Sequence, residues 1–170
     1  MTALIDKGCR STVYLTPPHI LDAVRAYFGG TINLDPATEP NNPTNAKTFY
    51  TEADNGLYLP WTDRTFVNPP YGRALMKWVE KICDEADDYN PEIVALLPGQ
   101  RFETRTWQDC LLPCTSLSAI VFLKGRLKFL RPDGTPAKSN PYGSMLYIFN
   151  DAERSSILSS FGHLGYIIWK

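Results

Sequence analysis

The stretch TFVNPPYG, residues 65–72, carries the strongest structural signal in the chain. Its first three residues are β-branched or aromatic, and they favour a short buried strand. Two consecutive prolines must end that strand, because proline has no amide hydrogen to donate to a sheet. Asn68 and Tyr71 are therefore predicted to lie in a stiff turn at the carboxyl end of a strand. Open α/β sheets bind their ligands at that edge.

Helix-like and strand-like segments alternate along the rest of the chain. Apolar residues at helical spacing predict helices over residues 16–28, 74–89, 104–110 and 152–161. Short apolar runs predict strands over residues 31–34, 47–51, 65–67, 93–97, 144–149 and 166–169, and a strand pair over 119–130 interrupted at Gly125. Thr16, before two prolines, is the expected N-cap of the first helix. The alternation predicts an α/β fold with a mainly parallel sheet and flanking helices.

A length of 170 residues suits one compact domain, and 44% hydrophobic residues can build its core. We expect residues 1–13 to be a loosely ordered N-terminal segment and residues 14–170 to form a single domain, with no separate recognition domain. The N-terminus lacks an apolar core of signal-peptide length, and no apolar run approaches a membrane span. A cytoplasmic location is therefore expected.

Cysteines and histidines do not form a metal-binding pattern. Cys110 and Cys114 are four residues apart, but no second pair and no nearby histidine completes a site. We expect no metal, and free thiols in a reducing cytoplasm.

Charge points to a local rather than a global contact with nucleic acid. The net charge is −1, from 17 basic and 18 acidic side chains, which is not the basic balance of a general nucleic-acid binder. One basic run has Asp133 as its only acid, and it comprises Lys124, Arg126, Lys128, Arg131 and Lys138. A solvated surface is the simpler interpretation of such a run. The apolar and aromatic residues interleaved with it favour nucleic acid.

The Asn-Pro-Pro-Tyr turn suits an exocyclic amine as its ligand. Such an amine is a poor nucleophile, because its lone pair is delocalised into the aromatic ring. Two acceptors on its hydrogens would direct the lone pair at a methyl donor, and the Asn68 side chain and the Pro69 carbonyl can supply them. Pro69 and Pro70 keep these acceptors in place. Tyr71 offers an aromatic face to a base extruded from a duplex. A rigid turn without function is the alternative.

Two acidic residues are candidates for the methyl-donor site. Asp35 is expected at the same sheet edge as Asn68, where it would meet the amino-acid part of S-adenosylmethionine or bound water. Asp35-Pro36 is also ordinary turn chemistry, and no glycine-rich loop follows it. Asp54 could accept a hydrogen bond from the adenine of the donor, or it could simply close the turn at Asn55-Gly56.

Further stretches complete a pattern that is more specific than any one of them. They are YLTPP (14–18), LDPA (34–37), FYT (49–51), DNGL (54–57), Trp61, FVNPPYG (66–72), WV (78–79), VALLP (94–98), FLKGRLKF (122–129) and GSMLYIF (143–149). With them the chain resembles the small phage-type DNA N6-adenine methyltransferases over roughly residues 14–150. The resemblance implies a Rossmann-like class I methyltransferase fold and S-adenosylmethionine as methyl donor. It also implies adenine in DNA as acceptor, and protection of phage DNA from restriction.

The same resemblance assigns residues to the site. Residues 68–71 would hold the target amine. The donor would be bound by Tyr14, Thr16, Asp35, Pro36, Ala37, Asp54 and Asn68. Only about thirty residues separate Asp35 from Phe66, so the fold is expected to be shortened between the first strand and the NPPY strand.

Recognition of DNA is then expected from loops. Arg126, with Lys124 and Lys128 beside it, would contact phosphate or a guanine edge. Phe129 would cover the flipped base from the side opposite Tyr71, or it would pack in the core. Further phosphate contacts are expected from Arg101 and Arg105, for which a solvated surface is the alternative.

Residue chemistry alone leaves other functions open. An N4-cytosine methyltransferase presents the same turn to a different base, and RNA or a protein glutamine amide also offers such a nitrogen. A nucleic-acid-binding module that kept the fold but lost turnover belongs to another class. The sequence is compatible with both a monomer and a homodimer, and it does not define the recognition sequence.

Overall fold

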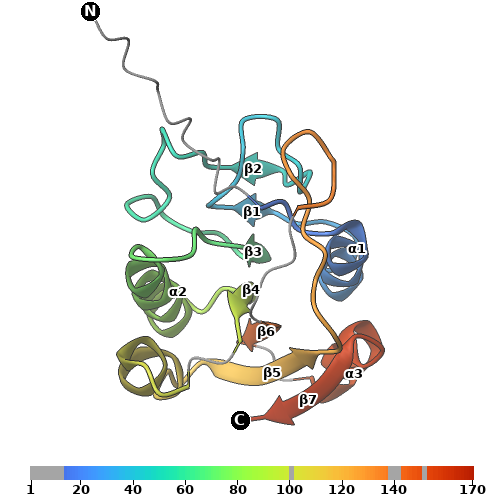
Figure 1. The fold of residues 1–170 in the computed structure, drawn as a ribbon. Helices are drawn as coiled ribbons and strands as arrows, with labels where there is room; N and C mark the ends of the chain where they lie inside the picture. The colour runs from blue at the N-terminus through green and yellow to red at the C-terminus, as the bar shows by residue number, and fades with distance from the viewer. Residues whose placement is uncertain (1–13, 100–101, 138–142, 151–152) are drawn as a thin grey trace, which may run out of the picture.

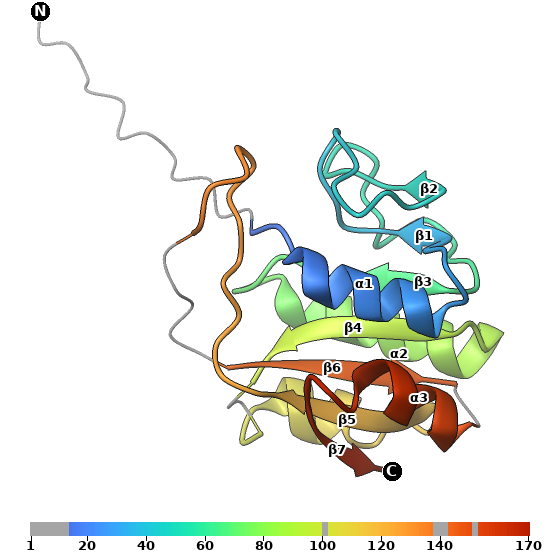
Figure 2. The same ribbon diagram turned by 90° about the vertical axis from the view of Figure 1, so that its right-hand side faces the viewer.

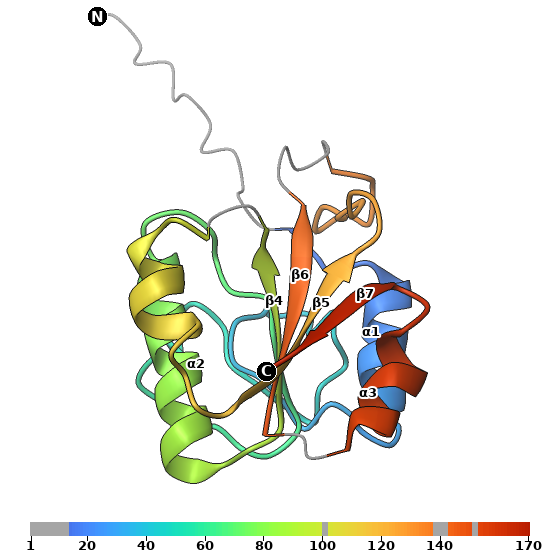
Figure 3. The same ribbon diagram turned by 90° about the horizontal axis from the view of Figure 1, so that it is seen from below.

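The computed structural model describes residues 14–99, 102–137, 143–150 and 153–170, and they form a seven-stranded sheet with helices on both faces (Figure 1). One face is covered by α2 (Leu75–Tyr89) and by the π-helical turn η1 (Thr106–Leu111). The other face is covered by α1 (Pro18–Tyr27) and α3 (Arg154–Phe161), as Figure 3 shows from below. This three-layer α/β arrangement is compatible with the expected Rossmann-like fold. The loosely ordered segment expected over residues 1–13 lies outside the described residues.

The sheet is mixed. Its strands are β1 (Leu34–Asp35), β2 (Thr48–Phe49), β3 (Thr65–Val67), β4 (Ile93–Pro98), β5 (Leu117–Leu123), β6 (Ser144–Phe149) and β7 (Gly165–Trp169). They lie in the order β2-β1-β3-β4-β6-β5-β7. β1 runs parallel to β2 and β3, and β3 runs parallel to β4. β6 is antiparallel to β4 and β5, and β7 is antiparallel to β5. Parallel pairing is therefore confined to the β2-β1-β3-β4 half, so the expected mainly parallel sheet holds for that half only.

Apolar side chains fill both faces of this sheet. On β3, Phe66 and Val67 point to opposite faces and join different hydrophobic clusters. All residues of β4 are buried, as expected for a central strand that is covered on both sides. Within the described ranges, every helix is too short or too polar to cross a membrane.

The shortened region between β1 and β3 brings two strand ends together. Only β2 and loops lie between these strands in the chain, and Leu34 of β1 pairs directly with Thr65 of β3. The strand expected over residues 31–34 is shifted to Leu34–Asp35, which pair with Thr48 and Phe49 of β2. Asp35 consequently ends β1, and Asn68 directly follows the neighbouring parallel strand β3.

Residues 119–130 do not form the predicted strand pair. β5 ends at Leu123, and Gly125 then adopts a φ of +77°, which turns the chain out of the sheet. Leu130 makes isolated antiparallel bridges with Leu15 and Pro136. Residues 124–137, called the basic loop below, therefore leave the sheet and return towards the beginning of α1 (Figure 2).

Two predicted helices differ in detail. Pro17, not Thr16, is the N-cap of α1, and it makes no side-chain cap hydrogen bond. Its fixed φ and the proline at the next position start the helix one residue later than predicted. The helix expected over residues 104–110 is the π-helical turn η1, which begins at Thr106 and ends at Leu111.

Candidate active site

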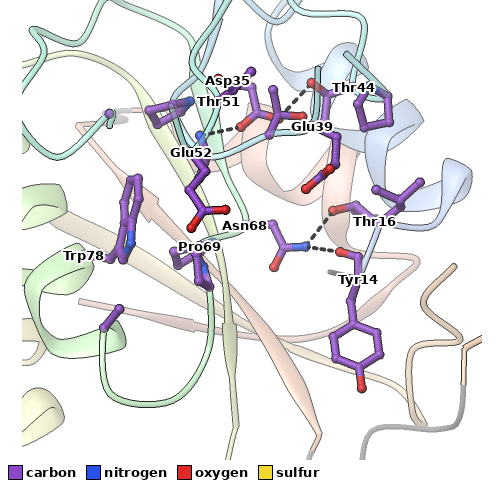
Figure 4. A pocket seen from close by; sticks show the side chains of 18 of the residues that line it. Tyr14, Thr16, Asp35, Glu39, Thr44, Thr51, Glu52, Asn68, Pro69 and Trp78 are labelled. Atoms are coloured by element: carbon purple, nitrogen blue, oxygen red, sulfur yellow. Dashed lines mark hydrogen bonds between the residues drawn. The ribbon is translucent and has the colours of Figure 1, made fainter. Parts of the chain in front are cut away.

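A cavity of about 540 Å³ opens at the carboxyl ends of β1 and β3. Three of the segments that line it come after β1, β2 and β3, and a fourth precedes α1 (Figure 4). The lining residues are Tyr14, Leu15, Thr16, Asp35, Pro36, Ala37, Thr38, Glu39, Pro43, Thr44, Thr51, Glu52, Asn55, Gly56, Leu57, Asn68, Pro69, Pro70, Tyr71, Ala74 and Trp78. The two strand-end features singled out from the sequence, Asp35 and the Asn68 turn, therefore meet in one cavity.

The carboxamide of Asn68 is held in a defined orientation. Its Nδ2 donates hydrogen bonds to the carbonyl oxygen of Tyr14 at 3.2 Å and to Oγ1 of Thr16 at 3.1 Å. Figure 4 shows the side-chain oxygen pointing away from both of these acceptors. Because the nitrogen is engaged by the protein, the oxygen is the end of the amide that remains to accept a hydrogen bond from a ligand.

The remainder of the turn is stiff and tied to the sheet. Pro69 is buried and Pro70 is exposed, and both line the cavity. Tyr71 is half-buried against the α2 side of the core, where its hydroxyl donates to the carbonyl of Leu96 at 3.5 Å. Burial raises the pKa of the Tyr71 phenol, so this hydroxyl stays protonated and keeps its donor role.

Asp35 is the buried acid of the cavity, with 2% of its surface exposed. Its carboxylate accepts hydrogen bonds from Oγ1 of Thr44 at 2.8 Å and from the amide of Ala37 at 3.1 Å. Burial raises the pKa of Asp35 to about 6, and these hydrogen bonds oppose part of that rise. Arg25 of α1 supports the arrangement, because its Nη2 donates to the carbonyl of Thr44 at 2.9 Å.

Asp54 occupies a different place from Asp35. Its Oδ2 accepts hydrogen bonds from the amide of Thr51 at 2.8 Å and from Oγ1 of Thr51 at 2.7 Å, which lowers its pKa. Asp54 is exposed and is not among the lining residues. Asp54 therefore closes a turn, which is the second of the two interpretations that its sequence position allowed. It fixes a loop whose other members, Thr51 and Glu52, do line the cavity.

Two lining acids were missed by sequence reasoning. Glu39 is half-buried and Glu52 is exposed, and both are seen at the cavity in Figure 4. Glu39 lies four residues after the strand-end Asp35, and Glu52 lies three residues after β2. Both glutamates could have been predicted from the sequence, because an acid shortly after the carboxyl end of a parallel strand is a candidate site residue. That rule was used only for Asp35 and Asp54.

Of the predicted DNA-contacting residues, those that the structure describes do not line the cavity. Lys124, Arg126 and Lys128 are exposed on the basic loop, whereas Phe129 is only 3% exposed. Phe129 belongs to the core cluster on the α1 side, so the packing alternative describes its position. The centroid of its ring lies 6.0 Å from that of the Tyr14 ring. Of these two aromatic residues, Tyr14 lines the cavity.

Arg105, also predicted to contact phosphate, is already engaged with a neighbouring acid. Nε of Arg105 lies 3.1 Å from Oδ2 of Asp109 in an exposed ion pair one helical turn away. Arg101 and Lys138 lie outside the described residues. Among the described residues, no three side chains of histidine, cysteine, aspartate or glutamate are grouped to hold a metal ion.

Fold and site together define an α/β protein with a small-molecule cavity at its strand ends, walled on one side by a rigid Asn-Pro-Pro-Tyr turn. A family model described as DNA N-6-adenine-methyltransferase (Dam) matches residues 7–163, and the chain belongs to this family. The match covers most of the chain and confirms the resemblance found in its motifs. No curated protein matches the chain.

Proposed function

We propose that the protein transfers a methyl group from S-adenosylmethionine to N6 of an adenine in DNA. The orientation of the Asn68 carboxamide carries this proposal, because it leaves the side-chain oxygen available beside the cavity. Family membership favours adenine over the other exocyclic amines.

The chemistry follows from the two acceptors of the turn. The Asn68 oxygen and the Pro69 carbonyl would each accept one hydrogen of the target amine, so that the nitrogen becomes pyramidal and its lone pair is directed at the donor. S-adenosylmethionine, when bound, supplies an activated methyl group on a positively charged sulfur. Its transfer forms an N–C bond, breaks an S–C bond and releases one amine proton to water. A dedicated base with a matched pKa is not required for this loss.

The cavity fits such a donor in size and charge. About 540 Å³ lies within the usual range for small-molecule sites. Asp35, Glu39 and Glu52 line it, and no lysine, arginine or histidine of the described part of the chain does so. Both the sulfonium and the ammonium of the donor are cationic, so an acidic cavity suits it. Of the predicted donor-binding residues, Tyr14, Thr16, Asp35, Pro36, Ala37 and Asn68 line this cavity.

Adenine in a duplex must be extruded to reach the turn. We propose that Tyr71 stacks on the extruded base and that the basic loop contacts the DNA backbone. Lys124, Arg126 and Lys128 are exposed there, and Leu130 of the same loop pairs with Leu15, which lines the cavity.

The decisive experiment identifies the methylated nucleoside. The protein is incubated with S-adenosylmethionine and DNA of mixed sequence, and the DNA is digested and analysed by mass spectrometry. N6-methyladenine is the expected product. N4-methylcytosine as the product would mean that the target base is cytosine. Methylation found only in RNA would mean that the substrate is RNA and not DNA. A protein that does not bind the donor would be the binding module instead.

A further inference from the structure

We propose that Thr16 is a positioning residue for Asn68, and that the basic loop holds Thr16 in place through a backbone bridge. The inference rests on the proposed function, since it concerns how the acceptor oxygen of Asn68 is aimed. It starts from the hydrogen bonds of the Asn68 nitrogen to Oγ1 of Thr16 at 3.1 Å and to the carbonyl of Tyr14 at 3.2 Å (Figure 4).

A carboxamide can work in this turn in only one of its two orientations. With the oxygen towards the ligand, it accepts a hydrogen from the target amine. With the nitrogen there, two donors would face each other. The carbonyl of Tyr14 can only accept a hydrogen bond, so it sets the sense of the Asn68 amide. The hydroxyl of Thr16 is the second anchor. It stops the amide from rotating about its last torsion, which is otherwise a soft one.

The Thr16 hydroxyl is available for this task because it caps no helix. Pro17 is the N-cap of α1, and Thr16 is 7% exposed in the cavity wall. A buried hydroxyl usually requires a partner. Asn68 supplies it, although 51 residues lie between the two positions in the chain.

The basic loop fastens the same segment from its other side. The amide of Leu15 donates to the carbonyl of Leu130 at 2.8 Å, and the amide of Leu130 donates back to the carbonyl of Leu15 at 3.0 Å. The rings of Tyr14 and Phe129 lie against each other beside this bridge. Residues 14–16 thus join Asn68 to a loop that carries exposed cations. A displacement of the loop on contact with DNA would therefore change the orientation of the Asn68 side-chain oxygen.

The first test compares Thr16→Val with Thr16→Ser. Valine keeps the shape of the side chain and removes the hydroxyl, whereas serine keeps the hydroxyl. With donor and DNA saturating, we expect the single-turnover rate of Thr16→Val to fall by about tenfold and that of Thr16→Ser to recover most of the loss. Donor affinity, measured by calorimetry, should change by less than about threefold in both variants. If donor affinity falls as much as the rate, Thr16 is a donor contact and the proposal is overturned.

A spectroscopic readout separates this proposal from the proposed function. The side-chain NH₂ of Asn68 gives two proton signals in a ¹⁵N correlation spectrum, and Asn68→Ser identifies them by their disappearance. Loss of the Thr16 hydroxyl should shift one of the two signals in the Thr16→Val spectrum, whether or not the protein methylates DNA. Unshifted signals would overturn the positioning role. A shift in a protein that methylates no nucleic acid would keep the contact and refute the methylation instead.

The bridge is tested with Leu130→Pro against Leu130→Ala. Both lose the leucine side chain, but only proline removes the amide hydrogen that is donated to Leu15. We expect Leu130→Pro to turn over about fivefold more slowly than Leu130→Ala and to shift the Asn68 signals, with equal donor affinity in the two variants. Equal rates and equal spectra would refute the bridge. Dispersed backbone signals from the β4 residues report that the proline variant is folded.

Discussion

Gly56 lies directly against the backbone of Pro36. A Cβ placed on Gly56 would be 2.1 Å from the carbonyl oxygen of Pro36, a contact that no side chain tolerates. Both residues line the cavity, and Gly56 also accepts a hydrogen bond from Nε1 of Trp61 at 2.9 Å. The loops that follow β1 and β2 are therefore packed together through a position that admits only glycine.

Gly56→Ala should disrupt this contact and reshape the cavity. We expect donor affinity to fall by about tenfold or more, because the Pro36 backbone must move away from its place beside Asp35. Gly143→Ala is the matched control, since a Cβ at Gly143 has nothing within 4 Å. Calorimetric titration with S-adenosylmethionine measures both variants. Unchanged affinity in Gly56→Ala would mean that the donor does not depend on these loops.

Asn68→Ala should abolish methyl transfer and leave donor binding within about threefold of the wild type. The reason is that alanine removes an acceptor of the target amine but none of the acids that line the cavity. Rates are measured with labelled donor, and affinities by calorimetry. Residual turnover close to that of the wild type would contradict the role of Asn68. A parallel loss of donor binding would show that the residue contacts the donor as well.

The raised pKa of Asp35 predicts a pH dependence of stability. Its pKa is about 6 in the folded protein and 3.8 when unperturbed, so the folded state binds this proton more tightly. Between about pH 4 and pH 6 the unfolded chain has lost the proton while the folded chain keeps it. Stability therefore falls as the pH rises through this window, by up to about 3 kcal/mol. Asp35→Asn removes this contribution. Denaturant unfolding at pH 4 and pH 7 should show a smaller fall for the variant, and equal falls would contradict the assignment.

The basic loop should set the salt dependence of DNA binding. Changing Lys124 and Lys128 together to Gln should reduce the slope of log affinity against log salt by about 2, if each lysine neutralises one phosphate. Lys47→Gln with Arg64→Gln is the charge-matched control, since these residues directly precede β2 and β3, at the edge away from the cavity. Fluorescence anisotropy over a range of salt concentrations measures the slopes. A slope that changes equally in both pairs would place the DNA elsewhere.

The position of the turn was predictable because it depends on local rules. Two prolines after Val67 must end a strand, and parallel strands place Asp35 and Asn68 at one edge in any α/β sheet. The long apolar run that became β4 was equally clear, since all of its residues are buried.

Long-range contacts decide the features that were predicted wrongly or missed. The second strand expected within residues 119–130 did not form, because Leu130 pairs with the distant Leu15 rather than with β5. Thr16 looked like a helix cap from its neighbours, but its hydroxyl bonds to Asn68, which local sequence cannot reveal. The position of Glu39, four residues after Asp35, indicated the strand edge, but its contact with the cavity depends on the path of the loop after β1.

The acids of the cavity should favour the methylated donor over its product. S-adenosylmethionine carries a sulfonium charge that S-adenosylhomocysteine lacks, whereas both carry the ammonium. Changing Glu39 or Glu52 to Gln should weaken donor binding by about three- to fivefold, a modest effect because these side chains are partly or fully exposed. Removal of an acid near the sulfonium would weaken binding of the donor more than binding of the product. Removal of an acid near the ammonium would weaken binding of both equally. Glu80→Gln on the exposed side of α2 serves as control. Calorimetry with both ligands measures the ratio. Unchanged affinities in both cavity variants would mean that charge in this cavity does not select the ligand.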